Sequence, residues 1–141
     1  RGSFISATYF IIDKRTKKVR YARAGHCPVL YYHAAKQALE YFKDRGVALG
    51  MVRNKSYANF IKAYEFEYQP GDMMVLYTDG ITEAKDGKGD EFGYDRLLTT
   101  VKEVSSLSAK QVQDHLISKL YEFSGTDNID DDYTTMIVKF V

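Results

Sequence analysis

Residues 71–83 read Gly-Asp-Met-Met-Val-Leu-Tyr-Thr-Asp-Gly-Ile-Thr-Glu, and this stretch decides the fold. An apolar run, Met73–Tyr77, follows the turn-forming pair Pro70-Gly71 and ends abruptly at Thr78-Asp79-Gly80. A short apolar run between two turn signals is typical of a strand that is buried on both faces. A carboxylate directly after such a strand lies at the rim of a sheet, held by a rigid element. We therefore expect Asp79 to belong to a metal site or an active site.

The rest of the chain is rich in strand patterns and contains two helix patterns. Residues 44–59 are rich in Gly and Asn and predict a loop. A capping box, Ser108-Ala109-Lys110-Gln111, opens the second helix, and Gly125 is its expected stop. Apolar residues at helical spacing over 94–104 predict the first helix. The other expected strands cover residues 4–12, 19–24, 29–33, 39–42, 60–68 and 133–140.

This order of elements, strands first, then two helices and a last strand, predicts one α+β domain with mainly antiparallel sheets. The apolar runs at residues 4–12 and 73–77 are too continuous for sheets that face water on one side. Stacked sheets with helices outside them satisfy this pattern, so we expect an antiparallel β-sandwich flanked by helices.

Composition excludes several classes of protein. The chain has 141 residues and a formal net charge of +1, which gives no general attraction to nucleic acid or to an anionic membrane. No apolar run approaches the ~20 residues of a membrane span. The single cysteine, Cys27, excludes an internal disulfide and fits a reducing compartment, so we expect a cytoplasmic location. The chain begins with Arg1 rather than Met, so we expect a fragment, a processed product or an engineered start.

Acidic residues flank two of the expected strands. Asp79 follows one strand, and Asp130, Asp131 and Asp132 precede the last strand. If these strands are antiparallel neighbours, the carboxylates meet at one rim, where a like-charge pair ~4 Å apart costs roughly 4 kcal/mol. A divalent cation removes this cost, and oxygen ligands favour Mg²⁺ or Mn²⁺ over Zn²⁺. The alternative is that the Asp run is a solvated loop and Asp-Gly a simple turn.

Several motifs, in order along the whole chain, resemble the SpoIIE/RsbU-type serine phosphatases, a bacterial branch of the metal-dependent PP2C class. Thr-Asp-Gly alone is a weak signal, but the motifs together are specific. They are Tyr-Ala-Arg-Ala-Gly-His at 21–26, Pro-Gly-Asp at 70–72, Thr-Asp-Gly-Ile-Thr-Glu-Ala at 78–84, Phe-Gly-Tyr-Asp-Arg-Leu at 92–97 and Asp-Asp-Tyr-Thr at 131–134.

The resemblance implies a β-sandwich flanked by helices, with two Mn²⁺ or Mg²⁺ ions at one end. It implies hydrolysis of phosphoserine or phosphothreonine on a regulatory partner protein of the anti-sigma-factor antagonist type. Asp79 and Asp131 are then metal ligands, and Asp132 belongs to the metal site as a ligand or by orienting it. Glu83 and Thr134 match supporting positions. His26 matches the Ala-Gly-His motif, for which a structural role in the turn is favoured over an acid role.

One family motif has no match in this chain. The family domain begins with an Asp-Val-Ser-Gly-His-Gly-like segment whose Asp bridges the two metals. The resemblance therefore covers about the later two-thirds of a family domain. We expect the chain alone to hold at most one metal, to have little phosphatase activity, and to form a homodimer through exposed sheet surface.

Two other readings compete with the phosphatase. The chain is alternatively a non-catalytic protein-binding module that keeps the same fold and lacks the chemistry. A phosphotransferase with an aspartate nucleophile would need Asp-x-Asp after a strand, and Asp79-Gly80-Ile81 does not provide it.

Overall fold

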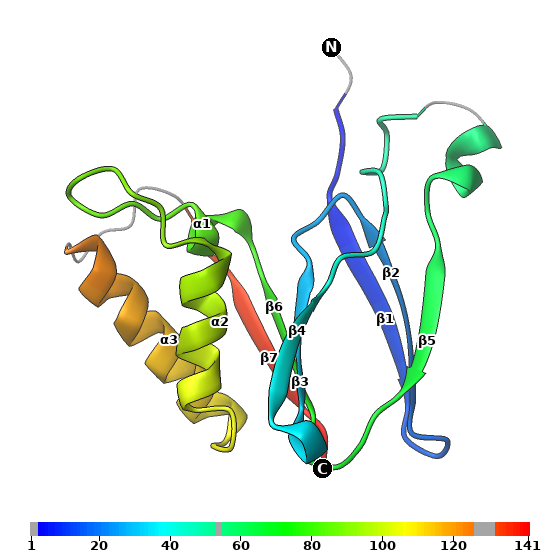
Figure 1. Ribbon diagram of the computed structural model, residues 1–141. Helices are drawn as coiled ribbons and strands as arrows, with labels where there is room; N and C mark the ends of the chain where they lie inside the picture. The colour runs from blue at the N-terminus through cyan, green and yellow to red at the C-terminus, as the bar shows by residue number, and fades with distance from the viewer. Residues whose placement is uncertain (1–2, 53–54, 126–131) are drawn as a thin grey trace.

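The computed structural model describes residues 3–52, 55–125 and 132–141 of the chain. In these residues the strands form two antiparallel sheets, in the orders β1-β2-β5 and β4-β3-β6-β7 (Figure 1). The predicted α+β class with antiparallel sheets is therefore confirmed. The strands are β1 (Ala7–Asp13), β2 (Lys18–Ala24), β3 (Val29–His33), β4 (Ala38–Phe42), β5 (Ala63–Glu67), β6 (Met73–Tyr77) and β7 (Thr135–Lys139).

Helices cover the outer face of the four-stranded sheet. Leu97 and Val101 of one helix, and Leu116 of the next, pack in one core cluster with the side chains of β3 and β6. Figure 1 shows both helices on the side of this sheet that faces away from β1, β2 and β5. The helical segments are α1 (Asp79–Thr82), α2 (Gly93–Glu103) and α3 (Ala109–Ser124), with the short 3₁₀ helices η1 (Ala34–Lys36) and η2 (Lys55–Asn59).

Strand β6 lies at the centre of the protein, as its apolar run predicts. Met73 and Val75 pack in the core beneath the helices, whereas Met74 packs in the core between the two sheets. All three side chains are buried. A strand that is buried on both faces in this way has its ends held in fixed positions. Asp79 follows shortly after the end of β6 at Tyr77.

The expectation of a covered second face is wrong for β1 in the described residues. Phe10 and Ile12 pack between the sheets. Tyr9 and Ile11 point the other way and are 66% and 48% exposed. The apolar run therefore marks a strand with one buried face and one apolar exposed face, because the described helices lie over the other sheet.

Strand β1 begins at Ala7, whereas the apolar run that predicts it begins at Phe4. Residues 4–6 leave the course of β1, and Ile5 pairs instead with Leu49 through two backbone hydrogen bonds of 2.9 and 2.8 Å. Apolar composition predicts that a segment pairs, but it does not show where the pairing partner changes.

A tight turn before β6 is built around Asp72. The backbone N–H of Asp72 donates to the carbonyl of Gln69, and Gly71 between them has φ +90°, as a type II turn requires. The Asp72 side chain is 3% exposed and accepts hydrogen bonds from Tyr31 Oη at 2.7 Å, from Ala34 N at 2.8 Å and from Gln69 N at 3.0 Å. One carboxylate thus ties the turn to β3 and to the start of η1.

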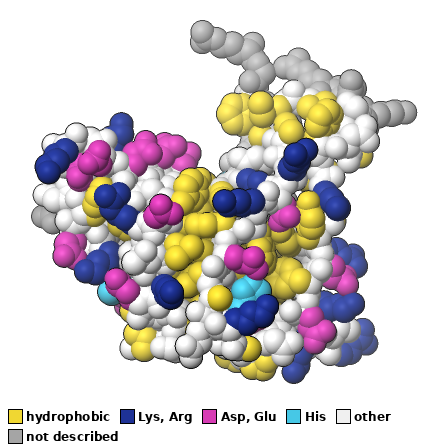
Figure 2. Space-filling model, viewed as in Figure 1, with side chains coloured by type: hydrophobic (Ala, Val, Ile, Leu, Met, Phe, Trp, Pro, Cys, Tyr) yellow, Lys and Arg dark blue, Asp and Glu magenta, His cyan; other side chains and the backbone are white. Residues whose placement is uncertain are grey.

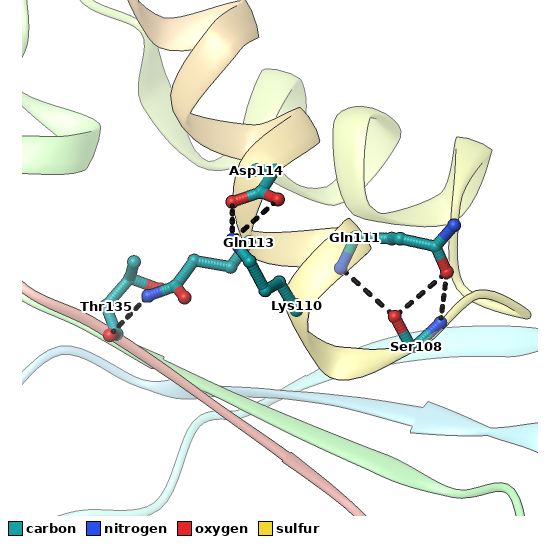
Figure 3. Close-up of polar contacts among 6 residues, drawn as sticks. All are labelled: Ser108, Lys110, Gln111, Gln113, Asp114 and Thr135. Carbon is teal, nitrogen blue, oxygen red and sulfur yellow. Dashed lines mark hydrogen bonds and ion pairs between the residues drawn. The ribbon is translucent and has the colours of Figure 1, made fainter.

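Helix α3 begins at the predicted capping box (Figure 3). Ser108 Oγ accepts from Gln111 N at 3.3 Å, and the Gln111 side chain accepts from Ser108 N at 3.1 Å. Gly125 ends the helix in the left-handed conformation at φ +66°. Gln113 donates from α3 to the carbonyl of Thr135 in β7. These contacts fix the helix against the strand that follows the acidic segment.

No helix in the described part of the chain is both long enough and apolar enough to cross a membrane.

Candidate functional site

Strands β6 and β7 are antiparallel neighbours, so the acidic segments that flank them meet at one edge of the sheet. Tyr77 at the end of β6 pairs with Thr135 at the start of β7. Beyond this pair, Thr78 N donates to Thr134 O at 3.0 Å, and Thr134 N donates to Thr78 Oγ1 at 2.8 Å. The Thr78 side chain therefore extends the pairing of the two strands up to the residue that precedes Asp79.

Asp79 is the first residue of α1, a single helical turn that the sequence patterns do not predict. Its carbonyl accepts from Glu83 N at 2.8 Å, which closes the helical turn. Gly80 is buried, and a Cβ at this position would collide with the carbonyl oxygen of Asp132. The main chain at Gly80 therefore lies against the main chain of Asp132. This contact places residues 79–80 beside residue 132.

Of the two other predicted metal ligands, Asp131 and Asp132, the structure describes only the second. Asp131 lies outside the described residues. Asp132 is described, is exposed and lies beside Gly80. No group of three or more His, Cys, Asp and Glu side chains that would hold a metal is found in residues 3–52, 55–125 and 132–141.

The donor chemistry at this edge fits a hard divalent cation. The oxygen atoms that the described contacts bring to this edge are the Thr78 hydroxyl and the carbonyl oxygens of Thr134 and Asp132. Oxygen atoms are the kind of ligand that Mg²⁺ and Mn²⁺ prefer. The lack of a Cβ at Gly80 keeps the two segments close enough to act together.

Cys27 lies near the same edge but is a poor thiolate. Burial raises the pKa of the Cys27 thiol, and the negative charges of Asp79 and Glu83 raise it further. The thiol therefore stays protonated at neutral pH, which disfavours a soft-metal site.

A cavity of about 190 Å³ opens between the two sheets at this end. Within the described residues, the buried hydroxyl of Thr8 has no hydrogen-bond partner. A lining that combines apolar side chains with a few polar ones is typical of a small binding site. It is lined by Thr8, Phe10, His26, Leu76, Tyr77, Thr78, Thr134 and Met136.

His26 is held at the rim of this cavity by its side chain and by its main chain. Its Nδ1 lies 3.2 Å from the Ser6 hydroxyl. The Arg23 guanidinium donates to the His26 carbonyl at 2.6 Å and also to the Asp44 carbonyl. The Ala-Gly-His motif forms the end of β2 and the start of the loop that leads to β3, with Gly25 at φ +67°, and the half-buried imidazole lines the cavity together with Thr78 and Thr134.

A larger depression of about 590 Å³ lies between α2 and α3. Its lining includes Phe92 and Phe123, whose rings meet edge to face, and Arg96 lies over the Phe123 ring at 4.7 Å. None of the residues that line it belongs to the edge formed by β6 and β7, so we place the candidate site at the smaller cavity.

Sequence reasoning missed part of this cavity. Thr8 and Phe10 come from β1 and Met136 from β7, and no motif marks them. The two-residue period of β1 places Thr8 on the same face as Phe10, which is the one sequence signal that relates them to the interior. The strands that lie opposite Thr8 and Phe10 depend on how the two sheets pack on each other. This packing cannot be read from a short stretch of sequence.

Comparisons with known proteins agree with this geometry. The family model described as Stage II sporulation protein E (SpoIIE) matches residues 1–141. Protein IcfG of Synechocystis is 30% identical over 108 residues, which is 76% of this chain and 16% of that protein. Phosphoserine phosphatase RsbU of Bacillus subtilis is 26% identical over 136 residues, which is 96% of this chain and 39% of RsbU. The chain thus spans less than half the length of either relative.

Solved structures share the fold. The SiaA-PP2C domain of Pseudomonas aeruginosa superposes with a TM-score of 0.82 at 19% identity, over 99% of this chain and 53% of that one. The phosphatase domain of SpoIIE from Bacillus subtilis, presoaked with Mn, superposes with a TM-score of 0.70 at 14% identity, over 96% and 56% of the two chains. At these identities the likeness shows a PP2C-like α+β fold.

Proposed function

Because the chain belongs to the SpoIIE family of PP2C-like phosphatase domains, we propose that residues 1–141 are part of one metal-dependent protein phosphatase domain. Its substrate is phosphoserine or phosphothreonine on a regulatory partner of the anti-sigma-factor antagonist type. One observation supports the proposal: the main chain of residues 79–80, after β6, lies against that of Asp132, before β7, beside a cavity lined by Thr78 and Thr134. The reaction takes place in the cytoplasm, where a lone cysteine stays reduced.

Asp79 and Asp131 are the proposed metal ligands, and Asp132 completes or orients the metal site. The bound Mn²⁺ or Mg²⁺ supplies a water of lowered pKa and positive charge for the phosphoryl oxygens. Thr78 fixes the position of Asp79 because its main chain and its hydroxyl both bind Thr134. Rigid placement of carboxylates is the main contribution of the protein in such a reaction, since no covalent intermediate is needed.

The cavity beside these carboxylates accepts the rest of the reacting group. Thr78, Thr134 and His26 provide polar atoms at its rim for phosphoryl or seryl oxygens. Phe10 and Leu76 form an apolar wall that excludes water from the reacting bond. A phosphorylated side chain that reaches over the edge of β6 and β7 would meet the carboxylates and the cavity together.

The test is phosphate release from a phosphoserine peptide by the full-length gene product. We expect turnover with added Mn²⁺, none after chelation, and recovery when Mn²⁺ is restored. A protein that binds the phosphorylated partner but releases no phosphate at any Mn²⁺ concentration would instead be the non-catalytic binding module.

The 141-residue chain alone is expected to bind at most one divalent ion and to show little turnover of p-nitrophenyl phosphate. Residues 3–52, 55–125 and 132–141 contain no group of three or more His, Cys, Asp and Glu side chains that would hold a metal, and a two-metal centre needs several such ligands. Calorimetric titration with Mn²⁺ and a chromogenic assay check both statements. Rapid turnover that disappears in Asp79→Asn would contradict them.

The same chain is expected to self-associate through its exposed apolar surface. Figure 2 shows hydrophobic side chains gathered at the end that carries the N-terminal residues. The outer face of β1 adds Tyr9 and Ile11. We expect light scattering to show dimers at high concentration, and Tyr9→Lys with Ile11→Lys to shift the population to monomer. A wild-type chain that remains monomeric would disprove this. The other exposed large apolar residues near this end are Phe4, Ile5, Leu49, Met51 and Phe60.

A further inference from the structure

The segment that carries Asp132 leads into the last strand of its sheet. In the order β4-β3-β6-β7, strand β7 has a neighbouring strand on one side only among the described residues. Thr134 is joined to Thr78 by two hydrogen bonds, and the main chain of Asp132 lies against Gly80. All of these contacts are made on the side of β6. Strand ends that pair along one edge open easily, so contacts with another layer of the fold decide how firmly Asp132 is held.

Burial alternates through this segment and shows which way its side chains face. Asp132 and Thr134 are exposed, whereas Tyr133 and Thr135 are half-buried. The two-residue period of β7 therefore continues back to Asp132. Tyr133 packs on the core cluster beneath the helices, and Thr134 lines the cavity between the sheets. The alternation thus places Tyr133 on the side of α3, and Asp132 in the set that contains Thr134.

Tyr133 meets a second tyrosine, which belongs to α3. The hydroxyl oxygens of Tyr121 and Tyr133 lie 3.0 Å apart, so that one hydroxyl donates to the other. The two rings meet edge to face at 79°, with their centroids 6.4 Å apart, as aromatic pairs prefer. Leu116 and Leu120 of the same helix are fully buried, which fixes α3 on the sheet. Tyr133 is therefore attached to a rigid element.

A second contact from α3 supports the same part of the chain. Gln113 donates to the carbonyl of Thr135 at 3.3 Å (Figure 3). Helix α3 thus holds the start of β7 at two points, through Thr135 and through Tyr133. Neither contact involves an acidic side chain, so each can be removed without a change in the charge of the candidate site.

We propose that Tyr121 and Tyr133 are positioning residues whose mutual contact fixes Asp132 at the edge that also carries Asp79. The inference rests on the proposed phosphatase function and adds two residues to it. Neither tyrosine needs to touch the substrate or the divalent ion. The pair holds the main chain next to Asp132 against α3, and groups that hold a metal ligand in place raise the affinity of the site for its ion.

Calorimetric titration of the full-length gene product with Mn²⁺ tests the proposal without an activity assay. Tyr121→Ala removes both the ring and the hydroxyl and should weaken Mn²⁺ binding by about 10-fold, an effect typical of groups that orient metal ligands. Tyr121→Phe keeps the ring and loses the hydrogen bond, so it should weaken binding by a smaller factor. In both variants kcat for a phosphoserine peptide should return towards the wild-type value at saturating Mn²⁺, because the carboxylates are still present.

Tyr31→Phe is the matched control for a loss of stability. It removes a tyrosine hydroxyl that donates to Asp72 at 2.7 Å, in the turn before β6 and so at the end of this strand that is away from Asp79. This variant should melt at a lower temperature and bind Mn²⁺ as the wild type does. Equal weakening of Mn²⁺ binding in Tyr31→Phe and Tyr121→Phe would reveal a general effect of stability and overturn the positioning role. Unchanged Mn²⁺ binding in Tyr121→Ala would overturn it as well.

Hydrogen exchange in the metal-free protein, followed by NMR, gives a second readout. The N–H of Thr134 donates to Thr78 Oγ1, so its exchange rate reports how often the segment opens. Tyr121→Ala should speed exchange at Thr134 and leave it unchanged at Phe140, whose N–H donates to the Asp72 carbonyl beyond the other end of β7. Exchange at Thr134 that keeps its wild-type rate would exclude the proposal. Faster exchange in a protein whose wild type releases no phosphate would disprove the phosphatase function and retain the anchoring of this segment by the two tyrosines.

Discussion

Asparagine in place of Asp79 is expected to lower the phosphatase kcat of the full-length protein by roughly 10³-fold. The substitution keeps the size of the side chain and removes its negative charge, so it weakens the hold on the divalent ion. The main-chain contacts around residue 79 are unaffected, because Glu83 N binds the Asp79 carbonyl and Thr78 binds Thr134. The measurement is phosphate release from a phosphoserine peptide across a range of Mn²⁺ concentrations.

A matched control separates the metal role from a general loss of charge. Asp114→Asn makes the same chemical change at an exposed position in α3, where the carboxylate pairs with Lys110 at 2.9 Å. This variant should retain wild-type activity. If Asp79→Asn keeps more than a tenth of the wild-type rate at saturating Mn²⁺, Asp79 is not a ligand that the reaction requires.

Alanine in place of Asp72 is expected to lower the free energy of unfolding by about 3 kcal/mol. The carboxylate is buried and accepts three hydrogen bonds, so its removal leaves the hydroxyl of Tyr31 and the N–H groups of Ala34 and Gln69 without their partner. An unpaired buried donor costs more than the lost hydrogen bond contributes. Urea unfolding followed by far-ultraviolet circular dichroism checks the value.

The contribution of one partner can be measured separately. Tyr31→Phe removes a single hydroxyl from the network and should cost about 1 kcal/mol, and it should cost less in the Asp72→Ala background. A loss below 1 kcal/mol for Asp72→Ala would mean that water replaces the carboxylate easily, contrary to the burial of this side chain.

Local sequence signals predicted the elements whose ends are marked by turn or capping residues. The bounds of β3 and β6 agree with the sequence prediction, and the turn at Gly71, the capping box at Ser108 and the stop at Gly125 are all present. In each case a backbone conformation or an unpaired N–H group demands a particular residue type. Segments without such markers, such as the start of β1, were predicted less well.

The candidate site was predictable only in part, and the reason is geometric. Two acidic segments next to two strands indicated a shared edge, because antiparallel neighbours bring opposite ends together. The cavity was not predictable, since Thr8 and Met136 reach it from different sheets. The helical turn at Asp79 was missed because a single turn is too short for a periodic signal. Asp131 lies outside the described residues, so its role stays a prediction.

The contact between Gly80 and Asp132 has a consequence for how this fold can change over evolution. The approach is made by main-chain atoms, and so is the hydrogen bond from Thr78 N to Thr134 O. These main-chain contacts do not require a carboxylate at position 79, so that side chain can be exchanged while the two segments stay in register. A side chain larger than hydrogen at position 80, by contrast, would separate the segments and disturb the architecture itself.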